Sequence, residues 1–228
     1  MELGVCLKNK SKQLMKHKGS FEFKNFRRKF EEKKLILATH NSGKLQELKN
    51  LLENINVTVY SSSEMSLPVP IENGNSFEEN AYIKASETTS ISGMASISDD
   101  SGLLIKSLGG SPGIYSADWA GPEKNFKKAI KKIEFLMQGK NDFSASMVCA
   151  LCLTWPDGKF KIFKGEMKGM ITFPPKGGLG FGYDPIFIPS IQPNKNCKLT
   201  YGQIEPEFKN KHSHRNMAFN KFYNDCFK

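Results

Sequence analysis

Apolar residues beyond residue 34 occur either in short runs or at helical spacing. Three short runs predict buried strands, at 35–38, 57–59 and 95–98. We expect the third strand to end on the turn-forming residues 99–102. Leucines at helical spacing over 45–52 predict a helix, and Ser76 with Glu79 forms a capping-box pattern that predicts the start of another. This half of the chain therefore alternates strands with helices.

The second half contains a hairpin pattern. Two apolar segments, 143–155 and 159–173, flank a Pro-Asp-Gly turn and predict long antiparallel strands. Helical spacing predicts a helix over 126–137 and a last helix from about Arg215. The glycine-rich stretch 174–189 is too irregular for us to expect regular structure there. Helices mixed with strands and one long hairpin predict an α/β fold with a mixed β-sheet flanked by helices.

Composition and charge narrow the class of protein. The 228 residues are 39% hydrophobic and 25% charged, as in soluble globular domains, and no apolar run approaches the roughly 18 residues of a membrane span. Residues 1–34 carry +7 of the net charge of +10, and residues 35–228 carry +3. We predict a basic, flexible leader at 1–34, a domain at 35–228 and a cytoplasmic location, since the leader lacks a secretory apolar segment. A weak contact of the leader with RNA or a membrane surface is the alternative.

The five cysteines do not predict a metal site. Without a secretion signal they are expected to be free thiols. Cys149 and Cys152 have C-x-x-C spacing but lie in a predicted strand, where positions three apart face opposite sides of the sheet. They cannot share one metal ion.

Three glycine-containing motifs fail when their chemistry is tested. Gly43-Lys44 lacks the remaining residues of a phosphate-binding P-loop. Residues 109–113 spell G-x-S-x-G, but Pro112 has no N–H for the oxyanion hole of a serine hydrolase. The glycines at 177–182 do not form a dinucleotide-binding pattern.

Two polar clusters follow predicted strands. The first lies where a helix begins, so its N–H groups and ammonium suit a phosphate, although an ordinary capped turn fits equally well. It comprises Thr39, His40, Asn41, Ser42, Gly43 and Lys44. The second cluster supplies hard oxygen ligands of the kind that Mg²⁺ selects, and it comprises Glu72, Glu78, Glu79, Asp99 and Asp100. For Glu79 a capping role, and for Glu78 a solvated first-turn charge, is the stronger interpretation.

Two further clusters lie in the last third of the chain. An aromatic face beside a carboxylate suits a flat heterocycle, although loop aromatics more often pack in a core; the residues are Phe181, Gly182, Tyr183 and Asp184. Cationic donors follow at Lys209 and over 212–215, and they suit phosphate or carbonyl oxygens better than a metal.

Taken in this order, the clusters resemble the inosine triphosphate pyrophosphatase family, which hydrolyses non-standard purine nucleoside triphosphates. The resemblance covers essentially all of 35–228 and leaves out the leader. It is carried by the segments ATHNSGKLQEL, SFEENAYIKA, SDDSGLLIKSLGGSPGIYSADWAG, PPKGGLGFGYDPIFIP and SHR. The family commonly has glycine where this chain has His40, which raises the question whether this backbone position needs a positive φ.

The resemblance implies an elongated fold of two lobes with a central cleft, usually as a homodimer, and a Mg²⁺-dependent reaction. Its substrates would be inosine, deoxyinosine or xanthosine triphosphate, and its products the nucleoside monophosphate and pyrophosphate. By matching position, Glu72 and Asp100 would hold the metal, and Asp100 would also accept the proton of water. Residues 39–44, Lys84 and Lys209 would bind the triphosphate, and Ser101 would touch the substrate. The base pocket would be formed by Phe181, Gly182, Tyr183, Asp184, His214 and Arg215.

The chemistry expected of such a site is attack of water on the α-phosphorus with pyrophosphate leaving. Lys44, Lys84 and Mg²⁺ would neutralise the triphosphate, since its charge otherwise repels the nucleophile. Donors such as Arg215 would accept the 6-carbonyl of hypoxanthine and reject the 6-amino group of adenine. Two alternatives stay open: a non-enzymatic nucleotide- or RNA-binding module, and a pyrophosphatase for modified pyrimidine triphosphates. A membrane or nucleic-acid partner is not expected for the domain itself.

Overall fold

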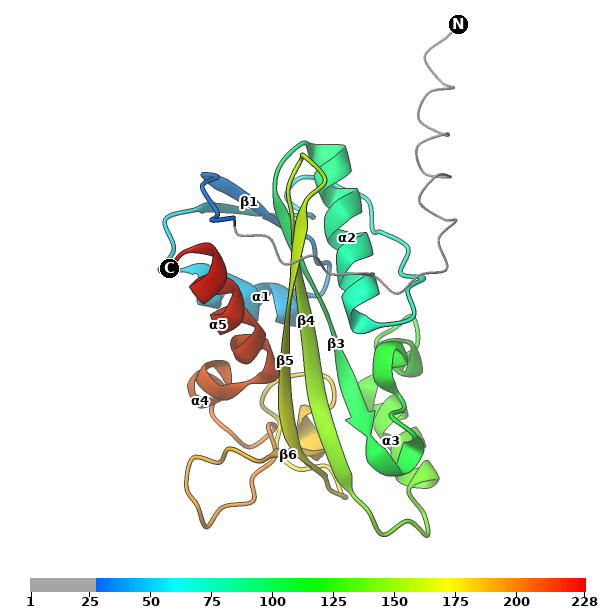
Figure 1. Cartoon of the computed structure of the whole chain (residues 1–228). Coiled ribbons are helices and arrows are strands. Elements are labelled where there is room, and N and C mark those ends of the chain that lie inside the picture. The colour runs from blue at the N-terminus through cyan, green and yellow to red at the C-terminus, as the bar shows by residue number, and fades with distance from the viewer. Residues whose placement is uncertain (1–27) are drawn as a thin grey trace, which may run out of the picture.

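A computed structural model describes residues 28–228 and contains one six-stranded sheet in the order β2-β1-β3-β4-β5-β6 (Figure 1). The strands are β1 (Lys34–Leu37), β2 (Thr58–Ser61), β3 (Ser96–Ile105), β4 (Ser144–Thr154), β5 (Phe160–Ile171) and β6 (Phe187–Pro189). β1 is parallel to β2 and β3, whereas β3 to β6 are antiparallel to one another. The predicted mixed sheet and its long hairpin are confirmed.

Helices cover both faces of the long strands. The helices are α1 (Ser42–Leu52), α2 (Phe77–Ser92), α3 (Phe126–Leu136), α4 (Pro206–His212) and α5 (His214–Cys226). α2 packs on β3 and β4, and α5 packs on β4 and β5 from the other side (Figure 1). Short 3₁₀ turns lie at Lys106–Leu108, Gly113–Tyr115, Asp118–Ala120 and Asp184–Ile186.

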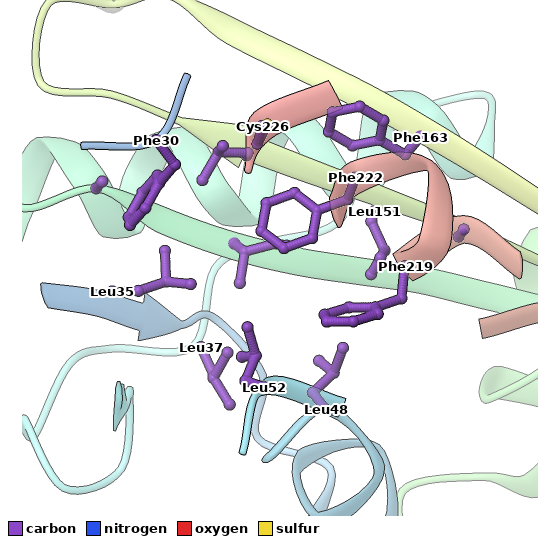
Figure 2. Packing of buried hydrophobic residues seen from close by; sticks show 14 of the residues in the cluster. Phe30, Leu35, Leu37, Leu48, Leu52, Leu151, Phe163, Phe219, Phe222 and Cys226 are labelled. Atoms are coloured by element: carbon purple, nitrogen blue, oxygen red, sulfur yellow. The ribbon is translucent and has the colours of Figure 1, made fainter. Parts of the chain in front are cut away.

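The side chains of β4 alternate between two cores. Cys149 and Leu151 pack in the cluster under α5, together with Phe222 (Figure 2), whereas Ala150 and Cys152 pack against α2. A strand covered on both faces favours apolar residues at successive positions, which explains the apolar run from Met147 to Leu153. The two cysteines lie on opposite faces, as predicted, and both are free and buried.

A third core fills the other end of the molecule. It joins α3 to the far halves of β3 and β4, with Leu103, Ile133 and Met147 buried between them. The Tyr183 ring meets Phe126 edge-on at 5.2 Å between ring centroids. Between this core and the two cores at α2 and α5 lies the cavity described below.

Two sequence predictions are corrected, and one element was missed. β3 does not end at 99–102 but continues to Ile105, because Asp99, Asp100 and Gly102 each stay in register with a residue of β4. The stretch 174–189 contains a strand, β6, which is paired to β5. The short helix α4 was not predicted.

The predicted leader, 1–34, lies mostly outside the described residues, and its flexibility stays a prediction. Its last residues contact the domain. The Phe30 ring is 7% exposed and packs on Trp155 and Phe227, and its N–H donates to the carbonyl of Cys226 at 2.9 Å. The Arg28 guanidinium lies 4.4 Å from the centroid of the Trp155 ring. Among the described residues, none of the helices is both long and apolar enough to cross a membrane.

These contacts predict that the folded unit includes residues 28–34. Phe30→Ala is expected to lower the free energy of unfolding by about 3 kcal/mol, because a buried aromatic side chain is lost and a cavity remains. Urea unfolding followed by tryptophan fluorescence measures the change. A chain that starts at residue 28 should unfold at the wild-type urea concentration, whereas one that starts at 34 should lose at least as much stability as Phe30→Ala. Equal stability of the two shortened chains would contradict the prediction.

Candidate active site

The turn between β1 and α1 carries the first polar cluster. The Asn41 Oδ1 accepts the Lys44 N–H at 3.1 Å and caps α1, and the Thr39 Oγ1 accepts the Asn41 N–H at 3.3 Å. Asn41 therefore is a capping residue, and the same turn lines the cavity. Among the described residues other than glycine, only Ser66 and Lys124 have a positive φ. His40 thus occupies an ordinary backbone conformation, and the suspected need for glycine at this position does not arise.

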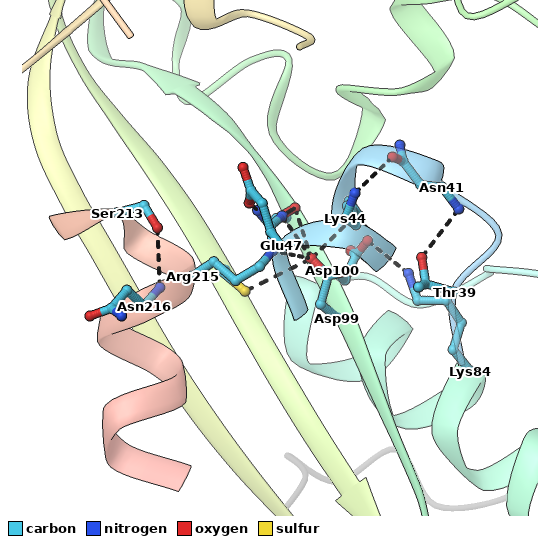
Figure 3. A network of polar contacts seen from close by, with 12 residues as sticks. Thr39, Asn41, Lys44, Glu47, Lys84, Asp99, Asp100, Ser213, Arg215 and Asn216 are labelled. Atoms are coloured by element: carbon cyan, nitrogen blue, oxygen red, sulfur yellow. Dashed lines mark hydrogen bonds and ion pairs between the residues drawn. The ribbon is translucent and has the colours of Figure 1, made fainter. Parts of the chain in front are cut away.

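The neighbouring aspartates of β3 point to opposite faces of the sheet, as expected for a strand. Asp99 faces α1 and α5: its Oδ2 lies 3.4 Å from the Lys44 Nζ and 3.0 Å from the Arg215 Nη2 (Figure 3). Burial alone would raise the pKa of Asp99, but the charges of Lys44 and Arg215 outweigh it and hold the pKa well below its usual range. Asp99 is therefore a permanently ionised structural anion.

Asp100 faces α2 and shares a cation with Glu72. The Lys84 Nζ lies 3.0 Å from the Asp100 Oδ1 and 2.7 Å from the Glu72 Oε2. Burial raises the pKa of Asp100, with the Glu72 charge adding to it and Lys84 opposing it. Burial alone would lower the pKa of Lys84, but the charges of Asp100 and Glu72 outweigh it and raise the pKa. Two carboxylates from separate segments thus converge on one positive charge.

The other two glutamates of the acidic cluster have structural roles. The Ser76 Oγ accepts the Glu79 N–H at 3.1 Å and the Glu79 Oε2 accepts the Asn75 N–H at 2.7 Å, so the capping interpretation is confirmed. Glu78 pairs with Lys164 on the surface at 2.8 Å. Neither lines the cavity.

Lys209 and Arg215 are both bound by Glu47 of α1, a residue to which the sequence analysis gave no role. The Glu47 Oε1 accepts from the Lys209 Nζ at 3.0 Å, and its Oε2 contacts the Arg215 Nη1. The Lys209 Nζ also donates to the Asp184 Oδ2 at 2.7 Å. Burial alone would raise the pKa of Glu47, but the charges of Arg215 and Lys209 outweigh it and lower the pKa. Glu47 is an ionised link between α1 and the two C-terminal helices.

These groups surround one cavity of about 370 Å³. All the residues that the family resemblance assigns to the site line it except Ser42 and Gly43. Gly43 has a packing role instead, because a Cβ there would lie 2.9 Å from the Phe181 ring. Besides the charged groups, an apolar wall formed by Leu103, Ile114, Phe126 and Met147 lines the cavity. The sequence predicted the polar residues but not this wall.

The sequence profile of the Ham1 family matches residues 35–225. The chain belongs to the Ham1 family. A relative from Rhodospirillum centenum named dITP/XTP pyrophosphatase is 42% identical over 203 residues, which cover 88% of this chain and 98% of the relative. One from Rhizobium meliloti with the same name is 38% identical over 215 residues, covering 87% and 98%.

Solved structures of the Ham1 family share the fold. The Staphylococcus aureus Ham1 protein matches with a TM-score of 0.74 and 34% identity over 84% of this chain and 97% of that one. A nucleoside-triphosphatase / dITP/XTP pyrophosphatase from Mycobacterium abscessus matches with a TM-score of 0.67 and 34% identity, covering 83% and 98%. The family resemblance recognised in the sequence is thereby confirmed. The docked residues 28–33 lie outside the matched range.

The histidine of the segment SHR, His214, is buried in the cavity wall beside two cations. His214 is 6% exposed, and its Nδ1 has no hydrogen-bond partner within 28–228. Burial, reinforced by the charges of Arg215 and Lys209, lowers the pKa of His214 well below the ordinary value of 6.5. The imidazole is therefore neutral at physiological pH.

This shift predicts how stability depends on pH. The unfolded chain binds a proton at His214 near pH 6.5 and the folded chain does not, so acidification favours unfolding. Between pH 7 and 5.5 the wild type is expected to lose about 1 kcal/mol more stability than His214→Gln. Urea unfolding at both pH values measures the difference. Parallel pH dependence in the two proteins would show that His214 titrates normally.

Proposed function

We propose that this chain hydrolyses non-standard purine nucleoside triphosphates, namely ITP, dITP and XTP, to the monophosphate and pyrophosphate, with Mg²⁺ as cofactor. Membership of the Ham1 family and relatives named dITP/XTP pyrophosphatase support the substrate class. The observation that carries the proposal is the convergence of Glu72 and Asp100 on the Lys84 ammonium, in a cavity that also contains Lys44. Carboxylates and ammonium groups facing one cavity suit a metal-bound polyphosphate.

Two carboxylates are the protein ligands that a Mg²⁺ site needs. Over 28–228 there is no group of three or more His, Cys, Asp or Glu side chains that could hold a metal, which argues against a site built wholly from protein ligands. Mg²⁺ commonly binds through one or two carboxylates, with water and substrate phosphates completing its octahedron. Glu72 and Asp100 fit this role because the Glu72 Oε2 and the Asp100 Oδ1 both lie within 3.0 Å of the Lys84 ammonium. When bound, Mg²⁺ supplies charge neutralisation at the phosphates.

The remaining groups have separate tasks in this proposal. Lys44 and Lys84 offset the charge of the triphosphate, and N–H groups of the turn that starts α1 bind phosphate oxygens. Asp100 orients the attacking water and accepts its proton, a role that suits a buried carboxylate facing the cavity. Asp99 is less suited to this role, since the charges of Lys44 and Arg215 lower its pKa and make its carboxylate a weaker base.

The base is proposed to bind against Phe181 and the apolar wall of the cavity. Arg215 has five N–H donors, but hydrogen bonds to Asp99, Glu47 and Ser101 leave at most one of them for a base. Selection of a 6-carbonyl over a 6-amino group therefore falls largely to backbone N–H groups and to His214. A pocket whose buried donors stay unpaired with adenine discriminates strongly against it.

Incubation of the full chain with Mg²⁺ and a panel of triphosphates tests the proposal. We expect dITP, ITP and XTP to yield monophosphate and pyrophosphate, ATP to react far more slowly, and EDTA to stop turnover. Preference for a modified pyrimidine triphosphate would favour the alternative of a pyrophosphatase for such nucleotides. Salt-sensitive binding of polynucleotide without turnover would favour the binding module. Light scattering tests the homodimer that we propose from the family resemblance.

A further inference from the structure

A buried amide contacts both Asp100 and the loop that carries Glu72, and the proposed mechanism gives it no role. Asn80 is on the first turn of α2 and is 5% exposed. Its Nδ2 donates to the Asp100 Oδ2 at 3.4 Å, and its Oδ1 accepts the Gly74 N–H at 2.8 Å. One side chain thus links Asp100 on β3 to the loop that carries Glu72.

We propose that Asn80 is a positioning residue that holds Asp100 and the Glu72 loop in the geometry required for the divalent cation. The inference rests on the proposed function and deepens it. The Asp100 Oδ1 is bound by Lys84 and its Oδ2 by Asn80, so the rotation of the carboxylate is fixed from both sides. Partners of this kind orient the ligands of metal sites, and their loss typically costs 10–100-fold in metal affinity or activity.

The loop itself is packed closely onto Asn80. A Cβ at Gly74 would lie 2.8 Å from the Asn80 Oδ1 and 2.7 Å from the Glu79 Cβ. Beside this contact, Glu79 accepts the Asn75 N–H. The side chain of Glu72 is 40% exposed, and it pairs with Lys84 of α2 at 2.7 Å. This ion pair and the hydrogen bond from Gly74 to Asn80 both tie the loop to α2, on the side that faces Asp100.

The chemistry of the position requires an amide. Asn supplies a donor toward a carboxylate and an acceptor toward a backbone N–H. Asp at this position would have no proton to donate to Asp100 at neutral pH, and Leu would provide neither group. Asn80→Leu therefore removes both hydrogen bonds while keeping the side-chain volume nearly constant. Gly74→Ala disturbs the same link from the loop, because the added methyl group pushes against the Asn80 Oδ1, but it removes no polar side chain.

The test compares wild type, Asn80→Leu, Gly74→Ala and the control Asn73→Ala, an exposed residue of the same loop. Three quantities are measured on the full chain: kcat and KM for dITP at saturating Mg²⁺, the Mg²⁺ concentration giving half-maximal rate, and Mn²⁺ binding without nucleotide by electron paramagnetic resonance. For Asn80→Leu we expect kcat to fall about 10–100-fold, half-saturation by Mg²⁺ and the Kd for Mn²⁺ to rise at least about fivefold, and KM to stay within about threefold. Gly74→Ala should change the same quantities less, and Asn73→Ala should change none of them.

Each outcome bears on the inference. Folded Asn80→Leu with wild-type kcat and Mn²⁺ affinity would overturn it, even if its Tm is lower, because a merely structural residue gives that result. A rise in KM at unchanged kcat would also overturn it, since Asn80 would then be a substrate ligand. If Asn80→Leu does not fold, Gly74→Ala decides by the same criteria. Wild type that binds Mn²⁺ but hydrolyses no triphosphate would refute the proposed function, while the Mn²⁺ comparison would still test Asn80.

Discussion

Asp100→Asn is expected to lower kcat for dITP by at least about 100-fold, the effect typical of losing a positioned general base. The amide can neither accept the proton of water nor offer an anionic oxygen to the metal. Steady-state kinetics at saturating Mg²⁺ measure the change. Asp142→Asn is the matched control, because Asp142 pairs with Lys106 in an exposed loop outside the cavity.

The fold should survive this substitution. Burial raises the pKa of Asp100, so ionising this side chain costs free energy in the folded chain. A neutral amide of the same shape removes that cost, although Lys84 then keeps only Glu72 as an ionic partner. We expect the free energy of unfolding to change by less than about 1 kcal/mol. A folded Asp100→Asn protein with near-normal kcat would show that another group accepts the proton.

Long helices and strands, in which the pattern of apolar residues extends over many positions, were predictable from sequence. Short elements that depend on tertiary contacts were not. The hairpin and α5 show their spacing over many residues. β6 has only three residues and α4 only seven, which is too short for a periodic pattern. β6 depends on pairing with β5. β3 passes through turn-forming residues because ion pairs from three helices compensate its buried aspartates.

The candidate site shows the same division. Unusual motifs such as THNSGK, DDSG and FGYD can be recognised in the sequence alone. Glu47 and Asn80 could not be identified in this way, since each is an ordinary polar residue on a helix. The structural role of Glu47 arises only when folding brings it into contact with Arg215, 168 positions away in the sequence. The glycine question at His40 was likewise decided by backbone geometry that one sequence does not contain.

Arg215→Met is expected to cause the largest loss of stability, about 3–5 kcal/mol, because it removes one partner from a buried ionic network. Arg215 is 2% exposed, and it bridges Asp99 and Glu47. Without it, the fully buried carboxylate of Asp99 keeps Lys44, at 3.4 Å, as its ion-pair partner and the Ser101 hydroxyl as a neutral donor. Glu47 keeps Lys209 as its ion-pair partner. Such a loss is comparable to much of the stability of a typical domain.

The comparison of single and double variants separates this cause from the loss of packing. In urea unfolding at pH 7, the double variant Asp99→Asn/Arg215→Met should be more stable than the sum of the two single losses predicts, by about 1–3 kcal/mol, because no uncompensated carboxylate remains at Asp99. Arg215→Lys keeps the charge but not the planar donor geometry and should fall between wild type and Arg215→Met. Lys221→Met, on the exposed face of the same helix, should stay within about 0.5 kcal/mol of wild type. A loss below about 1 kcal/mol for Arg215→Met is the behaviour of a surface ion pair. It would mean that water reaches the carboxylate of Asp99, whose side chain is fully buried in the structure.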